Sequence, residues 1–127
     1  NNLFSVDKPF SSNRKEEKKH GDAGTLIGSS LSGRGLIVDD VISSGSSIEE
    51  SINIIKKNKA VPFCVLVALD RMELGKSIRA SCEIESDNNI TVHSIINIDD
   101  VTLYLEDNKK YYDNYLRMKT YLDKFKR

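Results

Sequence analysis

Three short segments rich in apolar residues recur along the chain, at 36–42, 63–69 and 90–96; the first opens with Leu36-Ile37-Val38, and the second is apolar throughout. Half-buried strands alternate apolar and polar side chains, whereas strands of a parallel sheet that are covered on both faces are apolar throughout. We therefore expect three parallel strands here, and we expect the run 36–42 to be buried on both faces.

The segments that follow these runs have the spacing of helices. Ile48, Ile52 and Ile55 recur every three or four residues after the first run, and lysines gather at the end of that segment, where they favour a helix C-terminus. Further helices are expected at 76–86, 98–107 and 109–125. This alternation of strand and helix predicts an α/β fold with a parallel, Rossmann-like sheet.

The beginning of the chain has a different pattern. Residues 3–12 resemble an edge strand, and 25–28 a short second strand. Between them, residues 13–24 are highly charged and have no apolar stripe at either period, which predicts a flexible surface loop that ends at glycines. We expect a single domain over residues 1–127. Because the sequence opens on Asn1 and enters a strand almost at once, we expect it to be the C-terminal portion of a longer fold.

Acidic and small hydroxyl residues follow one another at the first strand. Asp39 and Asp40 precede the loop Ser43-Ser44-Gly45-Ser46-Ser47, at which a helix begins. A loop without bulky side chains can fold around a phosphate, so that backbone N–H groups and hydroxyls donate to its oxygens. The acids can accept ribose hydroxyls or hold Mg²⁺ through water. The alternative is a plain strand-to-helix turn, in which a serine forms a capping box with Glu49 or Glu50.

A second pair of polar residues stands at the end of the next strand. Asp70 and Arg71 follow the run 63–69. Ligands of open parallel sheets bind beyond the carboxyl ends of the strands, so this pair should share one edge with Asp39 and Asp40. Arg71 either forms a salt bridge with Asp70 or Glu73, or presents paired donors to a carboxylate or a pyrimidine edge.

The charged loop carries several cations, interleaved with acids. They are Arg14, Lys15, Lys18, Lys19 and His20. Taken alone, this pattern is typical of a solvated surface. Beside a phosphate-binding turn it also suits a mobile lid that brings cations to a diphosphate and excludes water, with His20 as a donor near neutral pH.

Composition narrows the classes of partner. Formal net charge is zero, so no overall field recruits nucleic acid or a membrane surface, and any anion site must be local. No apolar run approaches the length of a membrane span. The two cysteines lack metal-site spacing, so we expect unpaired thiols and a cytoplasmic protein.

These motifs, in this order, resemble the orotate phosphoribosyltransferases, which have the type I phosphoribosyltransferase fold. The stretch Val38–Ser47 resembles the family's signature for phosphoribosyl diphosphate (PRPP), and with the two strand residues before it we define the PRPP motif as 36–47. Leu69-Asp70-Arg71 resembles the strand end that contacts orotate. The charged segment 13–24 resembles the flexible catalytic loop. The family's N-terminal part, which covers the substrate, is absent.

The resemblance implies transfer of ribose 5-phosphate from PRPP to orotate, which gives orotidine 5′-monophosphate and diphosphate with the help of Mg²⁺. It implies catalytic roles for Lys18, His20, Asp39 and Asp40, and orotate contacts for Ser43 and Arg71. The implied PRPP-binding residues are Arg14, Lys15, Lys18, His20, Asp39, Asp40, Val41, Ile42, Ser43, Ser44, Gly45, Ser46 and Ser47. It further implies a homodimer, in which Arg14, Lys18 and His20 reach the partner's diphosphate while Lys15 serves its own site.

Three alternatives stay open at this point. A phosphoribosyltransferase for a purine or another base would lack the pattern from Arg14 to His20. A non-catalytic module that senses PRPP would keep residues 39–47 without a lid. A receiver domain also carries paired acids at a strand end, but it needs a third aspartate and a lysine at later strand ends, and Asp70-Arg71 fits that poorly.

Overall fold

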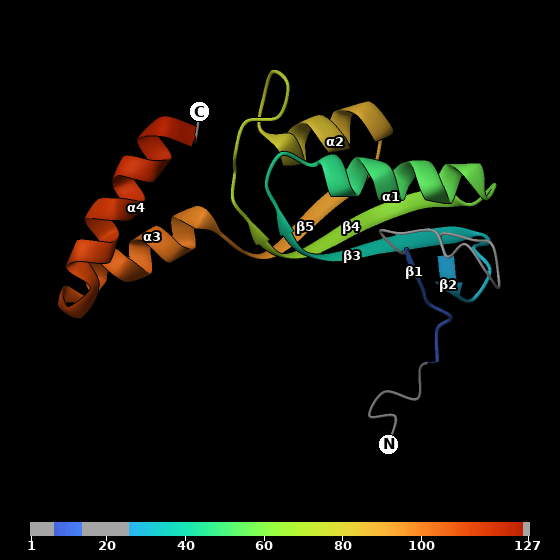
Figure 1. Ribbon diagram of the computed structural model, residues 1–127, viewed down its shortest axis with the longest axis horizontal. Coiled ribbons are helices and arrows are strands. Elements are labelled where there is room, and N and C mark those ends of the chain that lie inside the picture. The colour runs from blue at the N-terminus through green and yellow to red at the C-terminus, as the bar shows by residue number, and fades with distance from the viewer. Residues whose placement is uncertain (1–6, 14–25, 126–127) are drawn as a thin grey trace, which may run out of the picture.

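The described part of the chain comprises residues 7–13 and 26–125 of a computed structural model (Figure 1). Its centre is a three-stranded parallel sheet of order β3-β4-β5, formed by β3 (Arg34–Ile42), β4 (Val61–Asp70) and β5 (Thr91–Asn97). The helices α1 (Ser46–Lys57) and α2 (Ala80–Asn88) connect these strands in turn. The predicted α/β fold and the order of its elements are therefore confirmed.

The core lies between the sheet and these two helices, which cover the same face (Figure 1). Ile48, Ile52 and Ile55, the residues that repeat at helical spacing, are all buried against the sheet. Val65 and Val67 of the central strand β4 are fully enclosed beneath them. Burial of these aliphatic side chains, each worth about 1.5–3 kcal/mol, stabilises the packing of helix on sheet.

The opposite face of the sheet is open, and the expectation that β3 is buried on both faces is wrong. Val38 is 69% exposed on β3 and Ile95 is 75% exposed on β5, and both point away from α1 and α2. Consecutive apolar residues, such as those at 36–38, are typical of a sheet covered on both faces. Within the described residues, however, helices pack on one face only, so alternate side chains of β3 reach solvent.

Beyond β5 the chain forms a helical hairpin that projects past the carboxyl end of the sheet (Figure 1). It consists of α3 (Ile98–Asp107), a 3-10 turn (Lys109–Tyr111) and α4 (Tyr112–Phe125). Asn97 caps α3: its side-chain oxygen accepts from the backbone N–H of Asp99 and Asp100, at 2.8 and 3.1 Å. The two helices expected at 98–107 and 109–125 are therefore confirmed.

Two sequence predictions need correction at their boundaries. Of residues 7–12, only Ser11 and Ser12 are in a strand, as part of the short β1 (Ser11–Asn13), which pairs antiparallel with β2 (Leu26–Gly28). The helix expected at 76–86 begins at Ala80, because the preceding segment forms a tight turn in which the Gly75 N–H donates to the Ile78 carbonyl at 2.7 Å.

Both cysteines are unpaired, as expected. Within residues 7–13 and 26–125, no helix is long and apolar enough to cross a membrane.

Candidate active site

The carboxyl ends of β3 and β4 meet at one edge of the sheet, as the sequence predicted. Ile42 and Asp70 are partners in the parallel register, and the backbone N–H of Arg71 donates to the Ile42 carbonyl at 3.0 Å. This bond places Arg71 directly beside the start of the loop that begins at Ser43. The residues expected to contact a base and those expected to contact a phosphate are therefore neighbours.

The acid pair lies within β3, two to three residues before the strand ends. The Asp39 carboxylate accepts from the Asp40 N–H at 2.9 Å. Asp39 is partly buried and aligns with Val67, which faces the helices, whereas Asp40 is exposed and falls on the open face. Successive side chains of a strand point to opposite faces, so the two carboxylates have different surroundings.

The loop after β3 is shaped by Gly45. This residue has φ +83°, in the left-handed region that favours glycine, and it is the N-cap of α1. A Cβ built on it would lie 2.8 Å from the Ile84 Cδ1 atom, so the loop passes closely over α2. The capping boxes considered from the sequence are wrong, since no side chain caps this helix.

An uncapped start leaves the first N–H groups of α1 free to bind an anion. The first helical bond of α1 runs from Glu49 to the Gly45 carbonyl, so the N–H groups of Ser46, Ser47 and Ile48 have no partner within the helix. The loop also encloses a hollow of about 20 Å³, lined by Val41, Ile42, Ser43, Gly45, Ser46, Ser47 and Ile48. A helix N-terminus with free donors and serine hydroxyls is the chemistry expected of a phosphate site.

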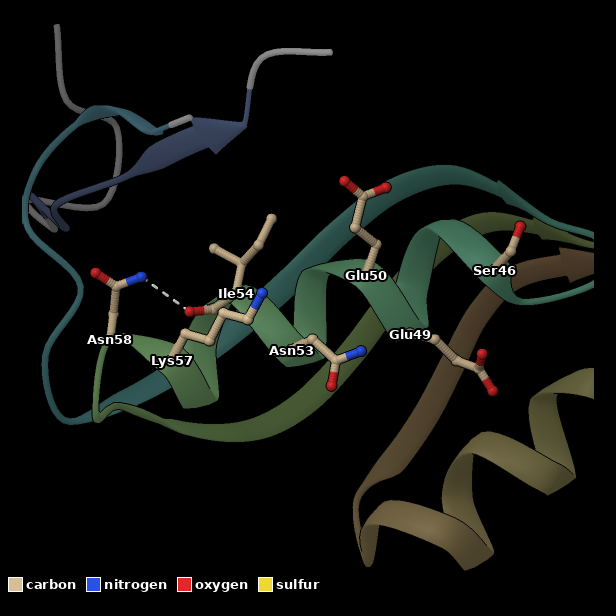
Figure 2. A pocket seen from close by; sticks show the side chains of 7 residues that line it. All are labelled: Ser46, Glu49, Glu50, Asn53, Ile54, Lys57 and Asn58. Carbon is tan, nitrogen blue, oxygen red and sulfur yellow. Dashed lines mark hydrogen bonds between the residues drawn. The ribbon is translucent and has the colours of Figure 1, made fainter. Parts of the chain in front are cut away.

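A larger hollow, of about 480 Å³, lies on the outer side of α1 (Figure 2). Figure 2 shows its lining side chains along one exposed helix face, from Ser46 to Asn58. Except for Ser46, these residues lie away from the carboxyl edge of the sheet, and they include Glu49 and Glu50, which repel anions. We therefore assign the candidate site to the smaller hollow at the loop.

Arg71 is held by two side chains. Its Nη2 atom lies 2.5 Å from the Glu73 Oε1 atom, which confirms one of the two salt-bridge partners considered from the sequence. The same nitrogen donates to the hydroxyl of Tyr121, and this hydroxyl donates to Glu73. Asp70, the other partner considered, instead accepts from the Met72 N–H at 2.7 Å and the Ser81 hydroxyl at 2.8 Å.

Tyr121 is the residue of this site that sequence reasoning missed. It lies on α4, 50 residues after Arg71. The aromatic residues of that helix recur at the spacing of packing residues, and nothing in the nearby sequence indicates that one of them forms hydrogen bonds at a site. The contact depends on how the helical hairpin folds back toward the end of β4.

The cations of the predicted lid, Arg14, Lys15, Lys18 and His20, lie outside the described residues. The structure describes the strands on either side of this segment, whose ends pair at Asn13 and Leu26. No group of three or more potential metal-ligating side chains occurs among the residues described.

Comparison with known proteins gives consistent matches, although no family model matches the chain. It is 44% identical over 125 residues to the orotate phosphoribosyltransferase of Haemophilus ducreyi, 46% to that of Actinobacillus pleuropneumoniae, and 45% over 121 residues to that of Escherichia coli. The crystal structure of orotate phosphoribosyltransferase from Francisella tularensis superposes with a TM-score of 0.72 at 27% identity, over 98% of this chain and 59% of that one.

The fold is therefore that of the type I phosphoribosyltransferases. Within that class, the chain is homologous to the orotate phosphoribosyltransferases, as its motifs predicted. The match covers 98% of this chain but only 59% of the length of the first curated relatives.

Proposed function

We propose that this chain carries the PRPP-binding and orotate-contacting part of an orotate phosphoribosyltransferase of pyrimidine biosynthesis. The observation that supports this most strongly is the hydrogen bond from Arg71 to the Ile42 carbonyl at the carboxyl edge of the sheet. This backbone bond sets Arg71 beside Ile42, which lies two residues after Asp40 and three residues before Gly45, the N-cap of α1. In this proposal the helix N-terminus serves the phosphate, the acids serve the sugar, and the arginine serves the carboxylate of orotate.

Each group has a distinct task in this proposal. The N–H groups and hydroxyls of residues 43–47 bind the 5-phosphate. Asp39 and Asp40 accept hydrogen bonds from the ribose hydroxyls, and Arg71, together with Ser43, binds orotate. Arginine suits this role because its planar guanidinium pairs with a carboxylate through parallel hydrogen bonds.

The residues also fit the proposed Mg²⁺. Carboxylate oxygens are ligands that Mg²⁺ prefers, and among the described residues Asp39 and Asp40 belong to no group of three or more ligating side chains. Such a site suits an ion that keeps its waters and binds mainly to substrate. When bound, Mg²⁺ would neutralise charge on the diphosphate. Asp39 and Asp40 would hold its waters or the sugar hydroxyls.

In the proposed reaction, the bond between ribose C1 and the diphosphate oxygen breaks, and the electron pair leaves with diphosphate. A ring nitrogen of orotate then forms the new bond to C1 and gives up its proton, which the departing diphosphate or water accepts. The protein contributes position and charge stabilisation, since neither substrate needs covalent activation by a side chain. Lys18 and His20 are proposed to neutralise the leaving diphosphate.

Substrate choice tests the proposal. The complete polypeptide that contains this sequence, given PRPP and Mg²⁺, should convert orotate to orotidine 5′-monophosphate with release of one diphosphate per turnover. Adenine and hypoxanthine serve as control bases and should not react. A product formed only from a purine base, or PRPP binding with no turnover of any base, would contradict the proposal.

We further propose that the protein is a homodimer whose lids act on the partner's site, and that it resides in the cytoplasm. The position of the β1–β2 ribbon supports the shared site: Figure 1 shows the ribbon near the amino end of β3, whereas the loop 43–47 follows the carboxyl end. The nine residues of β3 separate these ends by about 30 Å at roughly 3.3 Å per residue. The unpaired cysteines are in keeping with a reducing compartment.

Mixing two inactive variants tests the shared site. Lys18→Ala protein and Asp39→Asn/Asp40→Asn protein, incubated under conditions that allow subunit exchange, should partly regain activity. A hybrid dimer then has one site with both defects and one with neither. If exchange is demonstrated and activity does not return, each lid serves its own chain.

A further inference from the structure

The backbone around Arg71 is fixed by contacts that do not involve a ligand. Asp70 is buried, and its two carboxylate oxygens accept from the Met72 N–H at 2.7 Å and from the Ser81 hydroxyl at 2.8 Å. Met72 has φ +53°, an uncommon left-handed conformation for a side chain of this size. The chain therefore turns sharply after β4, and the turn sets the direction in which Arg71 leaves the sheet.

The side chain of Arg71 is fixed at its far end as well. Its Nη2 atom pairs with Glu73 and donates to Tyr121, and the Tyr121 hydroxyl donates to Glu73, so the three groups form a closed triangle. The guanidinium carbon also lies 5.6 Å from the centre of the Tyr121 ring, within range of a cation–π contact. Tyr121 is itself packed against Phe125, with ring centres 4.7 Å apart.

The hydroxyl of Tyr121 is suited to this double role because it stays protonated. Its hydrogen bond to Glu73, with a smaller effect of burial, raises the pKa of Tyr121 above its usual value near 10. A neutral phenol can accept from arginine and donate to a carboxylate at once, whereas a phenolate could not donate.

The triangle uses only one nitrogen of Arg71. Among the described residues, Nη1 and Nε have no hydrogen-bond partner, and the Arg71 side chain is 37% exposed. An arginine has five N–H donors, and those left over can donate to a ligand at the sheet edge. A side chain already held in place loses less freedom when the ligand binds.

We propose that Tyr121 and Glu73 are positioning residues that hold Arg71 in place to receive the pyrimidine substrate. This inference rests on the proposed function, because it assigns Arg71 to orotate. It gives the C-terminal helix α4 a part in substrate affinity, although no residue of α4 is proposed to touch the substrate.

A purely structural role is the competing explanation. The same triangle pins α4 to the end of β4, so its loss could loosen the hairpin without any effect on substrate. The two explanations differ in what they change: positioning affects the KM for orotate, whereas pinning affects the melting temperature.

Tyr121→Phe removes only the hydroxyl, and kinetics of this variant in the complete polypeptide separate the positioning role from the purely structural one. We expect the KM for orotate to rise about tenfold, as for loss of a hydrogen bond to a charged group, while the KM for PRPP stays within about twofold. Glu73→Gln should act in the same direction. Tyr112→Phe is the matched control, since it removes an exposed hydroxyl from the same helix and should leave both constants unchanged.

A double-mutant cycle shows whether Tyr121 acts through Arg71. In an Arg71→Ala background, Tyr121→Phe should cause no further loss, because the group it positions is gone. Additive losses would overturn the proposal, as would an unchanged KM for orotate or an equal rise in both KM values. Turnover by the wild-type protein tests the proposed function separately. If the wild-type protein accepts a base other than orotate, the positioning role is tested by the ratio of variant to wild-type KM for that base.

Discussion

The ends of β3 and β4 lie side by side but are built in opposite ways. Among the described residues, no side chain caps α1 at the end of β3, the Ser44 and Ser46 hydroxyls contact each other at 3.3 Å, and Asp40, two residues before the strand ends, is exposed. After β4, polar groups are bound to one another, with Asp70 held by Met72 and Ser81. The end of β3 keeps donors free for a strongly charged ligand, whereas the end of β4 holds Arg71 in place before a ligand of lower charge binds. Changes at the end of β3 should therefore affect turnover or PRPP binding, and changes at the end of β4 should affect affinity for the base or stability.

The largest effect is expected from the acid pair. Asp39→Asn/Asp40→Asn should lower kcat by at least about 10²–10³-fold, the usual result of losing one electrostatic group in an active site. The melting temperature should stay near that of the wild type, because Asp40 is exposed and Asp39 only partly buried. Steady-state kinetics and thermal unfolding measure the two quantities.

Asp113→Asn/Asp123→Asn is the control for the acid pair, since it removes two charges from the exposed surface of α4. Near-normal turnover in the Asp39→Asn/Asp40→Asn protein, or an equal loss in the control, would show that the acids have no specific task.

A smaller effect is expected from the shape of the loop. Gly45→Ala places a Cβ close to Ile84 and strains a left-handed backbone, at a cost of about 1–2 kcal/mol in the free energy of unfolding. Because the loop must shift, the KM for PRPP should rise about tenfold. Urea unfolding and kinetics with varied PRPP provide the test.

Gly33 offers a matched control for this change. It also has positive φ, +66°, but a Cβ there would meet no atom within 4 Å, and it lies at the other end of β3. Gly33→Ala should cost similar stability and leave the KM for PRPP unchanged. If both variants weaken PRPP binding equally, the effect of Gly45 is not local.

The smallest effect on function is expected behind β4. Ser81→Ala removes a buried hydroxyl that donates to Asp70, which should lower the free energy of unfolding by about 1–2 kcal/mol. Ser86→Ala removes an exposed hydroxyl of the same helix and should have little effect. If denaturant unfolding finds equal stability for the two variants, the buried contact of Asp70 does not stabilise this turn.

The comparison also shows what a sequence can predict. The order of strands and helices was predictable, because Ile48, Ile52 and Ile55 repeat locally and the strand segments are rich in apolar residues. The acid pair and the serine loop could be proposed as a candidate site from the sequence because their residues are adjacent in the chain. The left-handed turn at Gly45, and with it the uncapped start of α1, depends on contact with α2 and was not visible in the sequence.

Long-range packing accounts for the predictions that failed. The apolar residues of β3 indicate burial on both faces, but Val38 is exposed since helices cover one face of the described sheet. Arg71 was predictable as a site residue, whereas Tyr121, which binds it, follows only from how the helical hairpin folds.

In the proposed function the end of β3 binds PRPP and the end of β4 binds the base, and Arg71→Ala separates the two. Steady-state kinetics of this variant in the complete polypeptide, with each substrate varied in turn, should show a KM for orotate at least about tenfold higher, since arginine–carboxylate bonds are among the stronger ones. The KM for PRPP should change by less than about twofold. Equal losses for both substrates, or an unchanged KM for orotate, would contradict the account.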